Sequence, residues 1–166
     1  MNKKKTFIEI LFLIIYASLL IFFIYECMKD ASESTKSSNF VVEIIANIFS
    51  FFKGSKYEIS DNFSLIIRKL IGHFGYFFIL GIFSIIYHLL LNGFNKKASI
   101  AIHFIIGIGF AAISEFFLEG NTKGRSASFY DVLIDSGGFL LSSLIILLIY
   151  YLRKRNQKSK VLKNTN

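Results

Sequence analysis

Residues 132–155 read VLIDSGGFLLSSLIILLIYYLRKR, and this stretch decides the fold class of the chain. The part up to Leu152 is almost wholly apolar, and a helix needs about 20 such residues to cross about 30 Å of hydrocarbon. The basic run that follows is typical of the cytoplasmic end of a membrane span. One carboxylate, Asp135, lies within the span, where a charge is costly and by default marks function. The stretch therefore predicts a transmembrane helix that carries a functional group.

Three other segments have the length and composition of a membrane span: residues 7–25, 65–91 and 98–118. Of all residues, 54% are hydrophobic, and they stand in these blocks instead of being spread as in a soluble core. We therefore predict an all-α membrane protein, a four-helix transmembrane bundle. Residues 1–155 would form one transmembrane domain, and residues 156–166 would form a basic cytoplasmic tail.

Positive charge is concentrated at one end of each predicted span. Lysines precede the first span, two more close the short turn at 92–97, and the fourth span ends in the basic run. The positive-inside rule places all three basic segments in the cytoplasm. We predict a multi-pass protein of the cell membrane with both termini cytoplasmic and the lipid bilayer as its partner. The same placement explains the net charge of +8 without nucleic acid as a partner.

The connection between the first two spans then faces outward, and it has two parts. Residues 29–39 are polar and serine-rich, and we expect a loop there. From Phe40 to Lys53, apolar residues recur at helical spacing with polar residues on the other side. This run is too short and too polar to span, so we predict an amphipathic outer-face helix in the first extracellular loop. A re-entrant segment is the alternative.

Ionisable residues lie at one depth near the predicted outer surface. They come from the second, third and fourth spans and from the loop before the fourth: Arg68, Lys69, His73, Glu115, Arg125, Asp131 and Asp135. Charges within spans cost about 2.5 to 3.5 kcal/mol each at the helix centre. Arg68 and Lys69 would sit near a helix N-terminus and Glu115 near a C-terminus, both unfavourable positions. We therefore expect Arg68 or Lys69 to pair with Glu115. Small residues, including seven glycines, are expected to let the helices approach closely.

The residue types suggest roles within this cluster. Arg68, Lys69 and Arg125 suit an anionic headgroup or phosphate. His73 is the candidate for proton transfer, with Glu115 or Asp135 orienting it. Tyr76 and Asp131 complete the expected ligand-binding set. The residues alone leave open whether the cluster catalyses a reaction, only binds a ligand, or only fixes the register of the helices.

Other kinds of site find little support in the sequence. One histidine with nearby carboxylates could hold a divalent ion, but the spacing matches no recognised ligand pattern, so no metal and no cofactor are predicted. The single cysteine, Cys27, allows no intrachain disulfide and is expected to be a free thiol at a helix end. His88 and His103 lie toward the cytoplasmic halves of their spans, where packing or hydrogen bonds between helices are expected.

The same residues resemble two motifs of the VanZ-like family. The first is Arg68-Lys69-x-x-x-His73-x-x-Tyr76-x-x-x-Leu80. The second begins at Glu115 and continues as Gly124-Arg125-Ser126-x-Ser128-x-x-Asp131-Val132-Leu133-x-Asp135-x-x-Gly138. The likeness covers about residues 7–150. Leu118 stands where the family usually has Gln, and segment 120–124 replaces a shorter one that commonly carries a Pro-Gly pair.

The resemblance implies a four-helix membrane protein of the cell envelope of a Gram-positive bacterium. The namesake of the family raises resistance to the glycopeptide antibiotic teicoplanin, so we expect lowered susceptibility to such antibiotics. The expected partner is an anionic lipid, a cell-wall precursor headgroup or a glycopeptide. The alternative is a non-catalytic scaffold or accessory subunit whose buried charge network is structural. A small transporter ranks last, because the charges do not continue toward the inner face.

Overall fold

The computed structural model describes residues 3–56, 59–92 and 97–164, and within these ranges it contains helices and no strand. The α-helices are α1 Lys3–Cys27, α2 Ala31–Lys53, α3 Asp61–Ile67, α4 Tyr76–Asn92, α5 Lys97–Ile113 and α6 Phe129–Asn164. Two π-helical segments, η1 Arg68–Gly75 and η2 Ser114–Leu118, and one 3₁₀ turn, η3 Glu119–Asn121, continue these helices.

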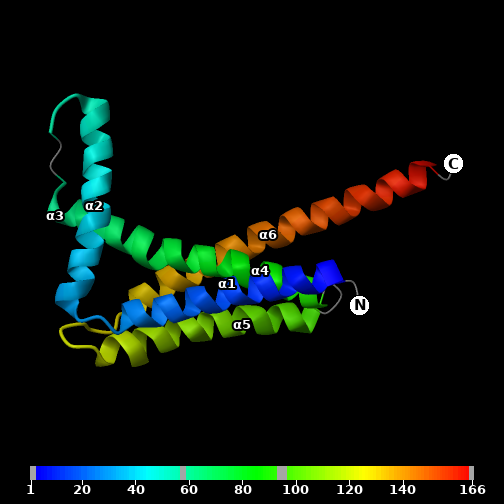
Figure 1. Ribbon diagram of the computed structural model, residues 1–166, viewed down its shortest axis with the longest axis horizontal. Coiled ribbons are helices and arrows are strands. Elements are labelled where there is room, and N and C mark those ends of the chain that lie inside the picture. The colour runs from blue at the N-terminus through cyan, green and yellow to red at the C-terminus, as the bar shows by residue number, and fades with distance from the viewer. Residues whose placement is uncertain (1–2, 57–58, 93–96, 165–166) are drawn as a thin grey trace.

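Four helices of the described chain are long and apolar enough to cross a membrane: Thr6–Cys27, Asp61–Leu91, Ser99–Asn121 and Phe129–Gln157. The predicted all-α fold with four spanning helices is therefore confirmed. In the bundle, α4 packs against α1 and α6, and α5 also packs against α6 (Figure 1). Most of the predicted turn at 92–97 lies outside the described residues.

Glycines bring α6 close to the second and third spans. A Cβ atom at Gly81 of α4 would lie 2.7 Å from the carbonyl oxygen of Phe139, and one at Gly138 would overlap the backbone of Phe74. A Cβ at Gly107 of α5 would overlap the ring of Phe139. These three close approaches were expected. At Gly72, Gly109 and Gly137 a Cβ would meet nothing within 4 Å, so that expectation was wrong there.

The hydrophobic core lies where α1, α4, α5 and α6 meet. It contains Phe23, Cys27, Phe77, Leu80, Ala111, Val132 and Phe139. The rings of Phe23 and Phe77 meet edge to face, with centroids 5.0 Å apart. Cys27 ends α1 and is a free, buried thiol, as expected. This core forms the inner wall of the site described below.

Helix α2 runs across one end of the bundle, which we call the α2 end (Figure 1). It begins at Ala31, so the loop expected at 29–39 is wrong for most of that stretch. The side chain of Asp30 caps the helix by accepting hydrogen bonds from the backbone N–H groups of Ser32 and Glu33, both at 2.9 Å. An aspartate cap satisfies donors that the first turn of a helix otherwise leaves free, and this outweighs the weak helix preference of the serines.

The start of α1 and the end of α6 lie on the side of the bundle opposite to α2 (Figure 1). There α1 begins, and α6 continues as helix past residue 155 to Asn164. Several large apolar side chains of α2 are exposed: Phe40, Ile44, Ile48, Phe49, Phe51 and Phe52. The described chain therefore leaves the apolar side of α2 uncovered.

Candidate functional site

The charged residues of the second and third spans lie on the π-helical segments. Arg68, Lys69 and His73 belong to η1, and Glu115 belongs to η2. In a π-helix the backbone hydrogen bonds run from i to i+5, and such turns are rare and frequent at functional sites. Hydropathy carries no signal for this change of hydrogen bonding, so the sequence did not predict it.

A pocket of about 480 Å³ opens at the α2 end, between the end of α1, the start of α2 and η1. Its polar lining consists of Glu26, Ser34, Thr35, Ser37, Ser38, Arg68, Lys69, His73, Tyr76, Glu119 and Arg125. Its apolar lining includes Phe22, Phe23, Val41, Leu65 and Ile71. The pocket thus combines charged groups with an apolar wall.

The two cations of η1 have different partners. The ammonium group of Lys69 lies 2.6 Å from Oδ1 of Asp131, in the first turn of α6. Arg68 donates from Nη2 to the side-chain oxygen of Asn39 on α2, and its buried Nε has no hydrogen-bond partner in the described chain. Neither cation pairs with Glu115, so that expectation was wrong.

Glu115 instead accepts a hydrogen bond from the backbone of the loop before α6. Its Oε1 accepts a hydrogen bond of 2.8 Å from the N–H of Ser128. The residue is only 1% exposed, and Oε2 has no hydrogen-bond partner among the described residues. The partner of Glu115 is therefore the backbone amide of Ser128 and not a cation of η1, as the sequence had led us to expect.

His73 and Asp135 lie side by side across the interface of η1 and α6. Nδ1 of His73 is 3.3 Å from Oδ1 of Asp135, the proximity expected from the sequence. Asp135 is only 1% exposed, and neither of its carboxylate oxygens makes a hydrogen bond within the described part of the chain. A buried carboxylate in this position can orient the imidazole and accept a proton from it.

Glu119 is a buried carboxylate that sequence reasoning missed, because the third span was ended at Leu118. It pairs with Arg125, which also donates from Nη1 to the carbonyl oxygen of Glu26 at 3.3 Å. Glu115 and Glu119 are four residues apart, and this spacing puts two side chains on one helix face. That spacing was the available signal. The Arg125 contacts tie the loop before α6 to the end of α1.

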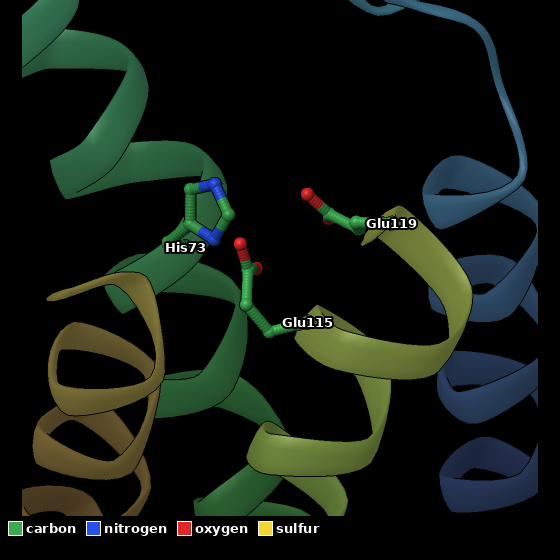
Figure 2. Close-up of side chains that lie close together, drawn as sticks. All are labelled: His73, Glu115 and Glu119. Carbon is green, nitrogen blue, oxygen red and sulfur yellow. The ribbon is translucent and has the colours of Figure 1, made fainter. Parts of the chain in front are cut away.

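Figure 2 shows the side chains of His73, Glu115 and Glu119 turned toward a common space. One ligand-type atom from each of these residues lies within 4.8 Å of the others. They come from η1, η2 and η3, so the second and third spans supply the whole group. Asp135 of α6 adjoins it through His73.

Tyr76 lines the pocket, as expected, but its hydroxyl is already used. It donates to the backbone carbonyl of Leu19 on α1, and its ring stacks on Phe23 with centroids 4.5 Å apart. Tyr76 therefore holds α1 against the second span and forms part of the pocket wall.

The two remaining histidines make hydrogen bonds between helices, as expected. His103 lies 3.3 Å from the hydroxyl of Ser84 through Nδ1 and 3.2 Å from that of Ser143 through Nε2. His88 lies 3.2 Å from the hydroxyl of Ser99. Both histidines lie outside the lining of the pocket at the α2 end.

The fold and the site together define a multi-pass α-helical membrane protein with a charged pocket at one end of its bundle. No family model, curated protein or solved structure matches this chain.

Proposed function

We propose that this chain is a VanZ-like protein of the cell envelope, whose pocket binds the anionic headgroup of an amphiphile at the outer leaflet and lowers susceptibility to glycopeptides. The observation that carries the proposal is the lining of the pocket. Arg68, Lys69 and Arg125 approach it beside an apolar wall. Guanidinium groups bind phosphate oxygens in pairs, and an apolar wall suits the first part of an acyl or prenyl chain.

The membrane orientation supports the same ligand class. The basic ends of the spans favour the cytoplasm, which puts the α2 end outside. With its exposed apolar residues turned to the bilayer, α2 would lie in the outer interface as an amphipathic helix. The pocket between α2 and η1 would then open at the depth of the lipid headgroups.

Of the three cations in the pocket lining, Arg68 is the one best able to bind an anionic ligand. Lys69 and Arg125 already have carboxylate partners, whereas the buried Nε of Arg68 lacks a hydrogen-bond partner in the described chain. A phosphate oxygen at Nε would satisfy this donor. Two amphiphiles carry that chemistry, an anionic phospholipid and a lipid-linked cell-wall precursor. If a proton is moved, His73 beside Asp135 is the group positioned for it.

Ligand binding can be measured by the thermal stability of the detergent-solubilised protein. A polyprenyl diphosphate and phosphatidylglycerol are the two anionic probes, and phosphatidylcholine is the control lipid. We expect an anionic probe to stabilise the wild type, and Arg68→Gln to weaken this binding about tenfold or more, since a hydrogen bond to a charged group contributes about 1.5–3 kcal/mol. Arg153→Gln, at the opposite end of α6, should bind like the wild type. Equal stabilisation by phosphatidylcholine, or unchanged binding by Arg68→Gln, would contradict the proposal.

The cellular role is tested by teicoplanin and vancomycin susceptibility with and without the gene. We expect the gene to lower susceptibility, and His73→Ala and Asp135→Asn to abolish this effect while the protein stays in the membrane at its normal level. Full resistance in well-expressed variants would defeat the proposed role of these residues.

A structural role for the charges is the second candidate, and two contacts favour it. Lys69–Asp131 and His73–Asp135 both join η1 to α6, so they could fix the register of these helices. The melting temperature of detergent-solubilised His73→Ala separates the candidates. A structural role predicts a marked fall in that temperature, whereas a binding or catalytic role predicts a folded protein without activity.

A further inference from the structure

We infer that the inner end of this pocket binds a divalent transition-metal ion through His73, Glu115 and Glu119. The inference goes beyond the proposed function and does not depend on which amphiphile the pocket takes. It arises from Glu119, which brings a second glutamate to a group that the sequence showed as one histidine and scattered carboxylates.

The arrangement of the three side chains suits a single ion. Their ligand atoms lie within 4.8 Å of one another, and Figure 2 shows them turned toward the same space. Nitrogen and oxygen ligands bind such ions at about 2.0–2.2 Å, so adjacent ligands of a tetrahedral or octahedral ion stand about 3.0–3.5 Å apart. Small side-chain rotations would therefore close the group around an ion.

Unsatisfied carboxylate oxygens are a second, independent observation that favours a cation site. Oε2 of Glu115 has no hydrogen-bond partner in the described chain, although the residue is only 1% exposed. Neither oxygen of Asp135 makes a hydrogen bond within the described chain, and its Oδ1 has only the ring of His73 beside it, at 3.3 Å. Burying a carboxylate without a partner is strongly unfavourable. The nearby cations do not supply that partner, because Lys69 pairs with Asp131 and Arg125 with Glu119.

Asp135 extends the group beside its histidine. Its Oδ1 is 3.3 Å from Nδ1 of His73. Ligating histidines usually donate their second N–H to a carboxylate, which fixes the orientation of the ring. Asp135 supplies that carboxylate if Nε2 ligates, and it is a further ligand if Nδ1 ligates. Either arrangement strengthens the hold of His73 on an ion.

The pocket gives the ion a route in and leaves it an open position. His73 and Glu119 belong to the pocket lining, whereas Glu115 and Asp135 do not and are buried. An ion at this place would face the pocket with part of its coordination sphere free. That position could take a water molecule or a phosphate oxygen of the ligand.

The ligand set indicates which ions fit. One imidazole with two or more carboxylates suits Zn²⁺, Mn²⁺ and Fe²⁺, which accept mixed nitrogen and oxygen ligands. No thiolate is part of the group, which disfavours copper(I). We therefore choose Zn²⁺ and Mn²⁺ as probes.

Metal content and binding can be measured on the full chain in detergent, after removal of any purification tag and treatment with a chelator. We expect one equivalent of Zn²⁺ or Mn²⁺ per chain by titration calorimetry. Glu119→Gln should weaken binding about tenfold or more, while Glu43→Gln, at an exposed carboxylate of α2 outside the pocket lining, should bind as the wild type does. The absence of saturable binding of either ion, or unchanged binding by Glu119→Gln, would overturn the inference.

A measurement on the wild type alone covers the case in which Glu119→Gln does not fold. Pulsed electron paramagnetic resonance of the bound Mn²⁺ should show coupling to one imidazole nitrogen, because His73 is the histidine of the group. Bound Mn²⁺ without nitrogen coupling would place the ion elsewhere and overturn the assignment. Since these readouts use no amphiphile or antibiotic, their failure is distinct from a failure of the proposed function.

Discussion

Lys69 and Asp131 show how a single charged side chain is accommodated near the end of a span. The side chain of Lys69 is 45% exposed and that of Asp131 is 14% exposed, with 2.6 Å between their charged atoms. Removing one residue of the pair leaves the other as a partly buried charge without a partner. Removing both leaves no uncompensated charge. The cost of each single change therefore depends on the other residue.

A double-mutant cycle on this pair measures that dependence. We expect Lys69→Gln and Asp131→Asn each to destabilise the detergent-solubilised protein, and the double variant to lose less than the sum, with a coupling of about 1 kcal/mol. Unfolding by denaturant gives the free energies. Strict additivity at Lys69 and Asp131 would show that their contact does not stabilise the bundle.

At the scale of elements, each helix end and helix contact near the site has an identifiable cause. Asp30 starts α2, and Gly138 lets α6 approach η1. The π-helical segments η1 and η2 then present His73 and Glu115 to the common space shown in Figure 2. The position of the pocket thus depends on α2 beginning at Ala31 and on α6 lying against η1.

The cap of α2 predicts a pH dependence. Hydrogen bonds from the backbone of Glu33 and the hydroxyl of Ser32 hold the pKa of Asp30 below its ordinary value. A carboxylate with a lowered pKa contributes stability that is complete above its ordinary pKa and is lost as pH falls through the lowered value. The melting temperature of the wild type should therefore exceed that of Asp30→Ala at neutral pH. The difference between the two melting temperatures should narrow below about pH 4.

Asp30→Asn is the control for this cap, because asparagine caps helices as well as aspartate does but does not titrate. Asp30→Asn should retain most of the stability of the wild type at neutral pH. The difference in melting temperature between Asp30→Asn and Asp30→Ala should not change with pH. A difference between wild type and Asp30→Ala that stays constant down to about pH 3 would contradict the assigned role of the carboxylate.

The contact of α6 with η1 predicts opposite effects at two adjacent glycines. A Cβ at Gly138 would overlap the backbone of Phe74, so Gly138→Ala should destabilise the protein by about 1–3 kcal/mol. A Cβ at Gly137 would meet nothing within 4 Å, so Gly137→Ala should be neutral or stabilising, since alanine favours a helix. Denaturant unfolding of the two variants in detergent checks both. Equal effects would contradict the observed packing.

Some of these features could be predicted from the sequence and others could not, for physical reasons. Long apolar blocks define spans, because only a helix satisfies its own backbone in a bilayer, and the four spans were predicted correctly. The partner of Glu115 was not predicted, because a backbone amide such as that of Ser128 has no signature in the side-chain sequence. Glu119 was missed because hydropathy ended the span one residue earlier. The start of α2 was missed because the polar, serine-rich stretch indicated a loop and the capping role of Asp30 was not recognised.

At the scale of the whole molecule, an even number of crossings puts both ends of the chain on one side and α2 on the other (Figure 1). The proposed role at the outer leaflet depends on which side that is. The basic ends of the spans favour the cytoplasm for the termini, and an outward pocket follows from this. The orientation is therefore the central claim of the proposed function.

The most direct test of that claim is labelling of single cysteines with a membrane-impermeant maleimide in intact cells. In a Cys27→Ser background, Thr35→Cys lies in the exposed part of the pocket lining. Arg155→Cys is an exposed position in the last turns of α6, a helix that ends on the side opposite to α2 (Figure 1). We predict that Thr35→Cys is labelled in intact cells and that Arg155→Cys is labelled only after permeabilisation. The reverse pattern would place the pocket in the cytoplasm and contradict the outer-leaflet function.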